Sequence, residues 1–105
     1  MHELDARRHL ESLQGRTIHT LTGRPNTVLR IDGDQVVVGT IKSPEGRPVP
    51  IEWVQAALDR LDAEGSVIIS VESVGYRSAF IGAVLSTIPG ATVGSGVVRL
   101  PRGGR

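Results

Sequence analysis

Hydrophobic and polar positions alternate with a period of two in the first half of this chain, which is typical of β-strands. Residues 17–21 alternate in this way, and the runs 27–31 and 35–41 are rich in β-branched side chains. Residues 32–34 (DGD) join the last two runs and are a strong signal for a hairpin turn. We therefore predict a small antiparallel sheet over residues 17–41.

The segment before this sheet has a helical pattern with a thin apolar stripe. Leu4, Leu10 and Leu13 recur on one side of a helix that we place over residues 3–14. Gly15 is suited to end it. Because so few apolar residues lie on this helix, we expect it to be an addition that packs on the domain or on a partner.

Residues 42–50 (KSPEGRPVP) contain three prolines and one glycine, a composition typical of turns. We predict that they form an ordered loop or linker between the two halves of the chain. Pro50 stands near the first position of the helix that follows, where the missing N–H costs nothing.

A helical period returns in the second half of the chain. In residues 51–62, apolar side chains recur at positions 51, 54, 58 and 61, and an apolar strand follows at 67–69. A short capped turn at 70–73 precedes a second helix at 77–88, and a glycine-rich hairpin at 91–100 closes the series. This order of helix, strand, short helix, helix and hairpin indicates a winged helix-turn-helix, whose second main helix usually enters a DNA groove.

Together the patterns predict an α+β protein, with a small N-terminal antiparallel sheet followed by a winged helix-turn-helix-like half. We expect a single domain over residues 1–100 and a disordered tail over 101–105. Within the domain, residues 1–15 form the N-terminal helix, 17–41 the strands and 51–100 the winged-helix part. A chain of 105 residues can bury a small core without metal or disulfide bonds.

The charge of the chain is small overall but unevenly distributed. The formal net charge is +1. Residues 51–65 hold one arginine against four acidic side chains, whereas residues 66–105 hold four arginines against one glutamate. Such a separation suits a protein that presents one face to phosphate groups.

Several classes of function lack the residues that they require. The chain has no cysteine and only three scattered histidines, which we expect to be solvated. It lacks the motifs GxxxxGK[ST], GxSxG and HExxH, so we expect no enzyme activity, no metal and no cofactor. It also lacks a long apolar run and an apolar leader. We therefore expect no membrane insertion and a cytoplasmic, nucleoid-associated location.

The helix at 77–88 carries the sharpest candidate for binding. Opposite its apolar stripe lies a face of small side chains, which suits close approach either to a DNA groove or to another element of the protein. Tyr76, Arg77 and Ser78 favour the groove, because helix-turn-helix proteins contact base edges with this end of the helix. Arg77 would read guanine with two hydrogen bonds; a solvated or ion-paired arginine is the alternative. The small-residue face consists of Ser78, Ala79, Gly82, Ala83 and Ser86.

The loops of the predicted sheet offer a second candidate surface. If they flank the same sheet edge, their basic and polar side chains can touch a DNA backbone or enter a groove. Ordinary loop polarity is the alternative explanation. Arg99, in the predicted wing, is assigned to contact with the DNA backbone. The candidate loop residues are Arg24, Asn26, Lys42, Ser43 and Arg47.

Three motifs resemble a domain of actinobacterial restriction systems: residues 21–26 (LTGRPN), 42–46 (KSPEG) and, above all, 74–85 (VGYRSAFIGAVL). Over residues 17–100 the chain resembles the N-terminal domain of McrA-like HNH endonucleases that restrict methylated DNA, and their stand-alone relatives. The resemblance implies binding of double-stranded DNA that contains 5-methylcytosine. It also implies that cleavage belongs to a separate HNH domain. No HNH histidine cluster follows residue 100, so we expect binding without cleavage.

The C5 methyl of cytosine projects into the major groove, where it is read by apolar contact. Ala79 or Ala83 is the candidate for this contact, or the flat face of an arginine that bonds guanine. Burial of one methyl contributes on the order of 1 kcal/mol, or about a five- to tenfold preference. Most of the affinity should come from phosphate contacts and fall with salt.

Two functions of other classes remain as alternatives. A sequence-specific winged-helix transcription regulator would use the same fold but need a dimer. The helix that carries Leu4, Leu10 and Leu13 is the candidate surface for such a homodimer. A protein–protein interaction module would use the small-residue face for packing and ignore DNA.

Overall fold

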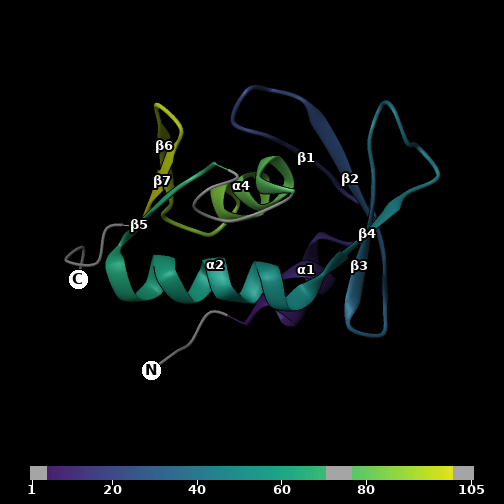
Figure 1. Cartoon of the computed structure of the whole chain (residues 1–105), viewed down its shortest axis with the longest axis horizontal. Coiled ribbons are helices and arrows are strands. Elements are labelled where there is room, and N and C mark those ends of the chain that lie inside the picture. Colours follow the sequence, from purple (N-terminus) through teal and green to yellow (C-terminus); the bar gives the residue numbers. More distant parts are fainter. Residues whose placement is uncertain (1–4, 71–76, 101–105) are drawn as a thin grey trace.

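Two antiparallel sheets flank a central helix, α4, and a longer helix runs along one side of all three (Figure 1). The computed structural model describes residues 5–70 and 77–100. The elements are α1 (Ala6–Leu13), β1 (Thr17–His19), β2 (Pro25–Asp32), β3 (Gln35–Gly39), β4 (Arg47–Pro50), α2 (Ile51–Glu64), β5 (Ser66–Ile68), α4 (Ser78–Ser86), β6 (Thr92–Gly94) and β7 (Val97–Arg99).

The larger sheet contains β1, β2, β3 and β4 in chain order, with each strand antiparallel to the next. The hairpin predicted at residues 32–34 is present, since Asp32 pairs with Gln35 across the turn. The prediction of a loop over residues 42–50 is wrong at its second half, where β4 pairs with β3. Its prolines misled the prediction, because proline is tolerated in an edge strand such as β4.

Helix α1 is an integral part of the fold and not an addition to it. Leu10 and Leu13 are buried in the core, and the backbone N–H of Ala6 donates to Oε1 of Gln55 on α2 at 2.8 Å. Both leucines are therefore inside the molecule and not on a surface open to a second copy. Leu4, the third residue of the predicted dimer surface, lies outside the described residues.

The second half forms helix, strand, helix and hairpin in the predicted order, with small shifts at the element ends. Helix α2 ends at Gly65, which adopts the left-handed conformation (φ 81°) that glycine favours. In the smaller sheet β7 lies between β5 and β6, and all pairings are antiparallel. The predicted turn at 70–73 falls mostly on residues 71–76, and these and the tail 101–105 lie outside the described residues.

A single hydrophobic core joins both halves of the chain, so the molecule is a small α+β fold. Trp53 packs against the edge of this core, and Phe80 lies within it. In the part of the chain that the structure describes, no helix is long and apolar enough to cross a lipid bilayer. The largest fully buried side chains are Leu10, Leu58, Leu61, Ile81, Leu85, Val28, Val36, Val38, Val49, Val54, Val67 and Val84.

Candidate functional site

The loop between β1 and β2 is closed by one buried hydroxyl. Oγ1 of Thr20 accepts from the backbone N–H of Arg24 at 3.0 Å, and the carbonyl of Thr20 accepts from the N–H of Gly23 at 2.8 Å. The N–H of Thr20 donates to the carbonyl of Arg24 at 2.9 Å, which completes the turn. Thr20 is buried while Arg24 is exposed, so the turn presents the arginine to solvent from a fixed base.

The loop between β3 and β4 is built on the same principle. The N–H of Thr40 donates to the carbonyl of Ser43 at 3.1 Å, and the N–H of Ser43 donates back to Oγ1 of Thr40 at 3.0 Å. Nε of Arg47 donates to Oγ of the buried Ser43 at 3.2 Å. Ser43 therefore supports the loop and holds Arg47, while Lys42 is exposed at the turn.

Both loops meet the N-terminal turn of α4 around a pocket of about 320 Å³. In Figure 1 both loops lie toward the upper side of the molecule, and the β1–β2 loop lies beside α4. The pocket joins segments that are more than fifty residues apart in the chain. It is mostly apolar in lining and is formed by Thr20, Arg24, Pro25, Asn26, Thr40, Ile41, Lys42 and Ala79.

Positive charge dominates the neighbourhood of this pocket. Arg24 and Lys42 are exposed and line the pocket. Arg47 is held near Lys42 by its hydrogen bond to Ser43, the residue that follows Lys42. Glu45 is the one carboxylate in the sequence of the two loops. An apolar hollow with cations beside it suits a ligand that carries both an apolar group and anionic groups.

Asn26 adds a polar group to the wall of the pocket. It lies in β2, pairs with Ile18 of β1 and is buried, with 6% of its surface exposed. A side-chain amide can both donate and accept hydrogen bonds with a ligand.

The middle of the small-residue face of α4 is used for packing within the protein. Gly82 and Ala83 are buried, and a Cβ added at Gly82 would lie 2.8 Å from Cγ2 of Ile69. Of the two alanines expected to contact a methyl, Ala83 is therefore in the core, which excludes it. Ala79 is exposed and lines the pocket.

Arg77 occupies an unusual position at the start of α4. It adopts the left-handed conformation (φ 66°), and its carbonyl accepts the N–H of Ile81 at 3.0 Å. Its Nε is buried and has no hydrogen-bond partner, and the residue as a whole is half-buried. Arg77 is not one of the residues that line the pocket, and Ser78 beside it is also half-buried.

Arg99 lies away from this group. It is the last residue of β7 and pairs with Ser66 and Thr92, at the opposite end of the hairpin from the turn at Ser95. The structure thus brings together Arg24, Asn26, Lys42 and Ala79, with Ser43 and Arg47 supporting them. Tyr76, another predicted site residue, lies outside the described residues.

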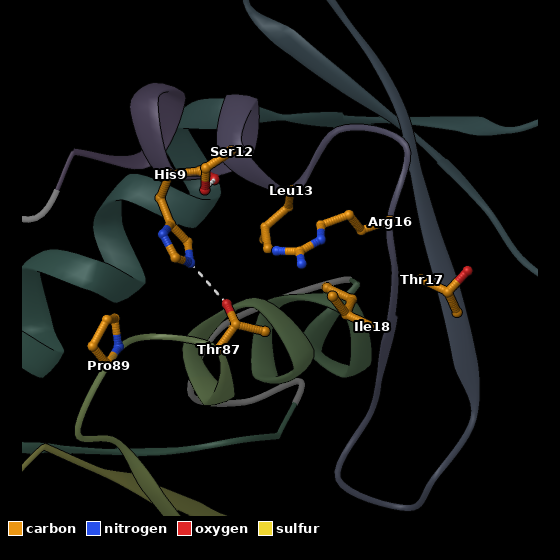
Figure 2. Close-up of a pocket in the computed structure, with 8 residues that line it drawn as sticks. All are labelled: His9, Ser12, Leu13, Arg16, Thr17, Ile18, Thr87 and Pro89. Atoms are coloured by element: carbon orange, nitrogen blue, oxygen red, sulfur yellow. Dashed lines mark hydrogen bonds between the residues drawn. The ribbon is translucent and has the colours of Figure 1, made fainter.

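A second pocket of about 490 Å³ lies between α1, β1 and the end of α4 (Figure 2). Nε2 of His9 lies 2.7 Å from Oγ1 of Thr87, whose own hydroxyl donates to the carbonyl of Val84 at 2.6 Å. His9 must therefore donate to Thr87 through an Nε2–H. Burial lowers the pKa of His9 below its ordinary value of 6.5. The expectation of a solvated histidine is wrong at this position.

The polar groups around this second pocket are largely engaged with the protein itself. The hydroxyl of Ser12 donates to the carbonyl of His9 at 2.5 Å, and Oγ1 of Thr17 lies 2.9 Å from Oγ1 of Thr27. Arg16 extends into the pocket (Figure 2). We interpret this region as the joint between α1 and α4 because the hydrogen bond from His9 to Thr87 connects these elements.

Ile41 and Thr20 line the pocket but were not predicted as site residues. Ile41 was predicted inside a strand over 35–41, whereas β3 ends at Gly39 and Ile41 is 78% exposed in the loop. The signal available was an isoleucine next to a lysine at the start of a segment rich in proline. The role of Thr20 as the base of a turn depends on contacts that the sequence does not reveal.

Comparisons with protein-family models, with characterised proteins and with solved structures found no match to this chain. Over residues 5–70 and 77–100, no group of three histidine, aspartate or glutamate side chains is placed to hold a metal ion. The site is therefore interpreted from its geometry and from the motifs in the sequence.

Proposed function

We propose that this protein binds double-stranded DNA that contains 5-methylcytosine and does not cleave it. The observation that carries the proposal is the convergence of Arg24, Lys42 and Ala79 around one apolar pocket. Two of the three motifs that resemble methylated-DNA-binding domains contribute the two loops, and the third contains Ala79. The cations are suited to phosphate groups, and the apolar lining is suited to a methyl.

The order of the smaller sheet supports a winged-helix-like arrangement of the second half. The strand after the first helix, β5, pairs with the second strand of the hairpin, β7, as in winged-helix proteins. However, the middle of α4 is buried, so it does not offer a free recognition face. We therefore assign base reading to the loops and the first turn of α4, and not to the length of the helix.

This assignment changes the roles of the arginines. Arg24 is exposed and lines the pocket, so it replaces Arg77 as the main candidate for contact with bases or with phosphates beside them. Arg77 is half-buried at the helix start, and Arg99 remains a candidate for contact with the DNA backbone. The alternative of a protein–protein interaction module that uses the small-residue face loses support, because Gly82 and Ala83 already pack inside the protein.

Fluorescence anisotropy with a methylated duplex and its unmethylated twin tests the proposal. We expect the methylated duplex to bind about five- to tenfold more tightly, as the burial of one methyl predicts. Both affinities should fall between ~50 and ~150 mM salt because phosphate contacts release counterions. Equal affinities would reduce the protein to a general DNA binder, and nicking of plasmid in magnesium or manganese would contradict binding without cleavage.

Arginine variants locate the surface in the same assay. Arg24→Ala should cost roughly 1–3 kcal/mol of binding free energy. Arg30→Ala is the matched control, because Arg30 is exposed on β2 near the end of the strand that is far from Arg24, and it should leave binding unchanged. If Arg77→Ala and Arg99→Ala weaken binding while Arg24→Ala does not, the helix start and the hairpin form the DNA surface instead.

A further inference from the structure

Ile41 is held out into solvent by the loop that carries it. It is 78% exposed, more than the other exposed large hydrophobic residues of the described chain, Ile68 (60%) and Val93 (48%). Ile41 and Lys42 are the two central residues of the turn that Thr40 and Ser43 close with reciprocal hydrogen bonds. Because Ser43 is buried at the base of this turn, the exposure of Ile41 follows from the loop geometry.

Ile41 also lines two pockets. One is the pocket of about 320 Å³ described above, and the other is a pocket of about 250 Å³. Pro25 and Thr40 line both of them as well. One flank of the Ile41 side chain is therefore part of the wall of the larger pocket, which Asn26 and Ala79 also line.

The charged residues beside Ile41 indicate which kind of ligand would contact its side chain. Lys42 follows it in the turn, and Arg24 lines the same pocket. Two cations beside Ile41 favour a ligand rich in phosphate groups, such as duplex DNA. In the major groove of DNA the apolar groups are the C5 methyl groups of thymine and 5-methylcytosine. Ala79, on α4, is also exposed and lines the same pocket. Its side chain offers one methyl group, whereas the side chain of Ile41 offers a larger, branched apolar surface.

We infer that Ile41 is the specificity-determining residue that contacts the C5 methyl of 5-methylcytosine in duplex DNA. This inference rests on the proposed function and deepens it. Arg24 and Lys42 bring the duplex to the loops, and the flank of Ile41 that lines the larger pocket packs against the methyl. This contact adds binding free energy only on methylated DNA, because an unmethylated cytosine leaves that flank of Ile41 exposed to water.

The test compares Ile41→Ala, Ile41→Val and the matched control Ile68→Ala, on methylated and unmethylated duplexes of one sequence. We expect Ile41→Ala to reduce the preference from about five- to tenfold to near parity, through weaker binding of the methylated duplex. Ile41→Val should keep most of the preference, and Ile68→Ala, on β5, should keep all of it. Thermal unfolding should be nearly unchanged in Ile41→Ala, because the side chain is exposed.

The possible failures are distinguishable from one another. If the wild type prefers methylated DNA and Ile41→Ala retains that preference, the inference is wrong while the proposed function stands. An equal loss on both duplexes would also overturn it, since Ile41 would then contact DNA regardless of methylation. If the wild type binds both duplexes equally, or neither, the proposed function fails and the inference fails with it.

Discussion

The two loops around the pocket and the small-residue face of α4 both contain small side chains, but these side chains have different structural roles. Both contain glycine and serine, together with alanine in the helix face and threonine in the loops. In the middle of α4 these residues lie against other elements, with Gly82 in contact range of Ile69. In the loops the hydroxyls of Thr20 and Ser43 are turned inward as supports, and the charged side chains point outward. Small residues thus permit close packing in one region and support turns with exposed charged side chains in the other.

Gly46→Ala should have the largest effect on this comparison, on the loop side. Gly46 adopts φ +103°, and an added Cβ would lie 2.5 Å from Cγ1 of Val37 and 2.8 Å from Cδ1 of Leu29. The left-handed backbone and the overpacking together should cost about 2–5 kcal/mol of the free energy of unfolding. Urea denaturation measures this loss.

Gly23→Ala is its matched control. Gly23 has a similar positive φ of +91° in the other loop, but an added Cβ would meet nothing within 4 Å. We expect it to lose only the backbone part, about 1–2 kcal/mol. Equal losses at the two glycines would mean that the close packing under the second loop contributes nothing.

Gly82→Ala should have a smaller effect, on the helix side. The new methyl would lie 2.8 Å from Cγ2 of Ile69, which costs about 1–3 kcal/mol of overpacking. Helix propensity returns about 0.8–1 kcal/mol of this. We expect a net loss of stability by denaturant titration and an unchanged methyl preference. A stabilised protein with altered DNA binding would show that this face is open and not packed.

The pH dependence of His9 should be the smallest effect, at the far end of α4. Burial lowers the pKa of His9 in the folded protein, so near and below pH 6.5 the unfolded chain binds a proton more readily than the folded one. Stability should therefore fall as the pH drops from 7.5 through 6.5 toward 5. His9→Gln keeps a donor for Thr87 but does not titrate.

Thermal midpoints of wild type and His9→Gln across this pH range check the prediction. The drop on acidification should be smaller in His9→Gln. His19→Gln is the matched control, because it removes a histidine from an exposed position on β1. An identical pH dependence in wild type and His9→Gln would show that another group is responsible.

Local signals in the sequence predicted most of the individual elements. The turn at residues 32–34, the apolar spacing of α2 and the glycine-rich hairpin each depend on neighbouring residues, and all three are present. Strand β4 was missed because its prolines resemble a turn, and only its edge position makes them acceptable. Helix α1 was underestimated because a thin apolar stripe can still be fully buried when α2 lies against it.

The candidate site was predicted only in part, for a physical reason. Arg24, Lys42 and Asn26 were selected because loop residues at one sheet edge should meet, and they do. The exposure of Gly82 and Ala83 could not be decided from helical spacing, because small residues serve close contact with any surface. Only the position of Ile69, thirteen residues before Gly82 in the chain, shows which surface that is.

The prolines of β4 have a consequence for how molecules of this protein meet. Pro48 and Pro50 are two apart, so their nitrogens face the same side of the strand, and this is the side away from β3 in a stable edge strand. Neither nitrogen carries a hydrogen, so another strand approaching this edge finds donors missing at both positions. β-Augmentation is thereby blocked at the outer border of the sheet whose loops present Arg24 and Ile41. High local concentrations should then bring these molecules together without joining their sheets at this edge.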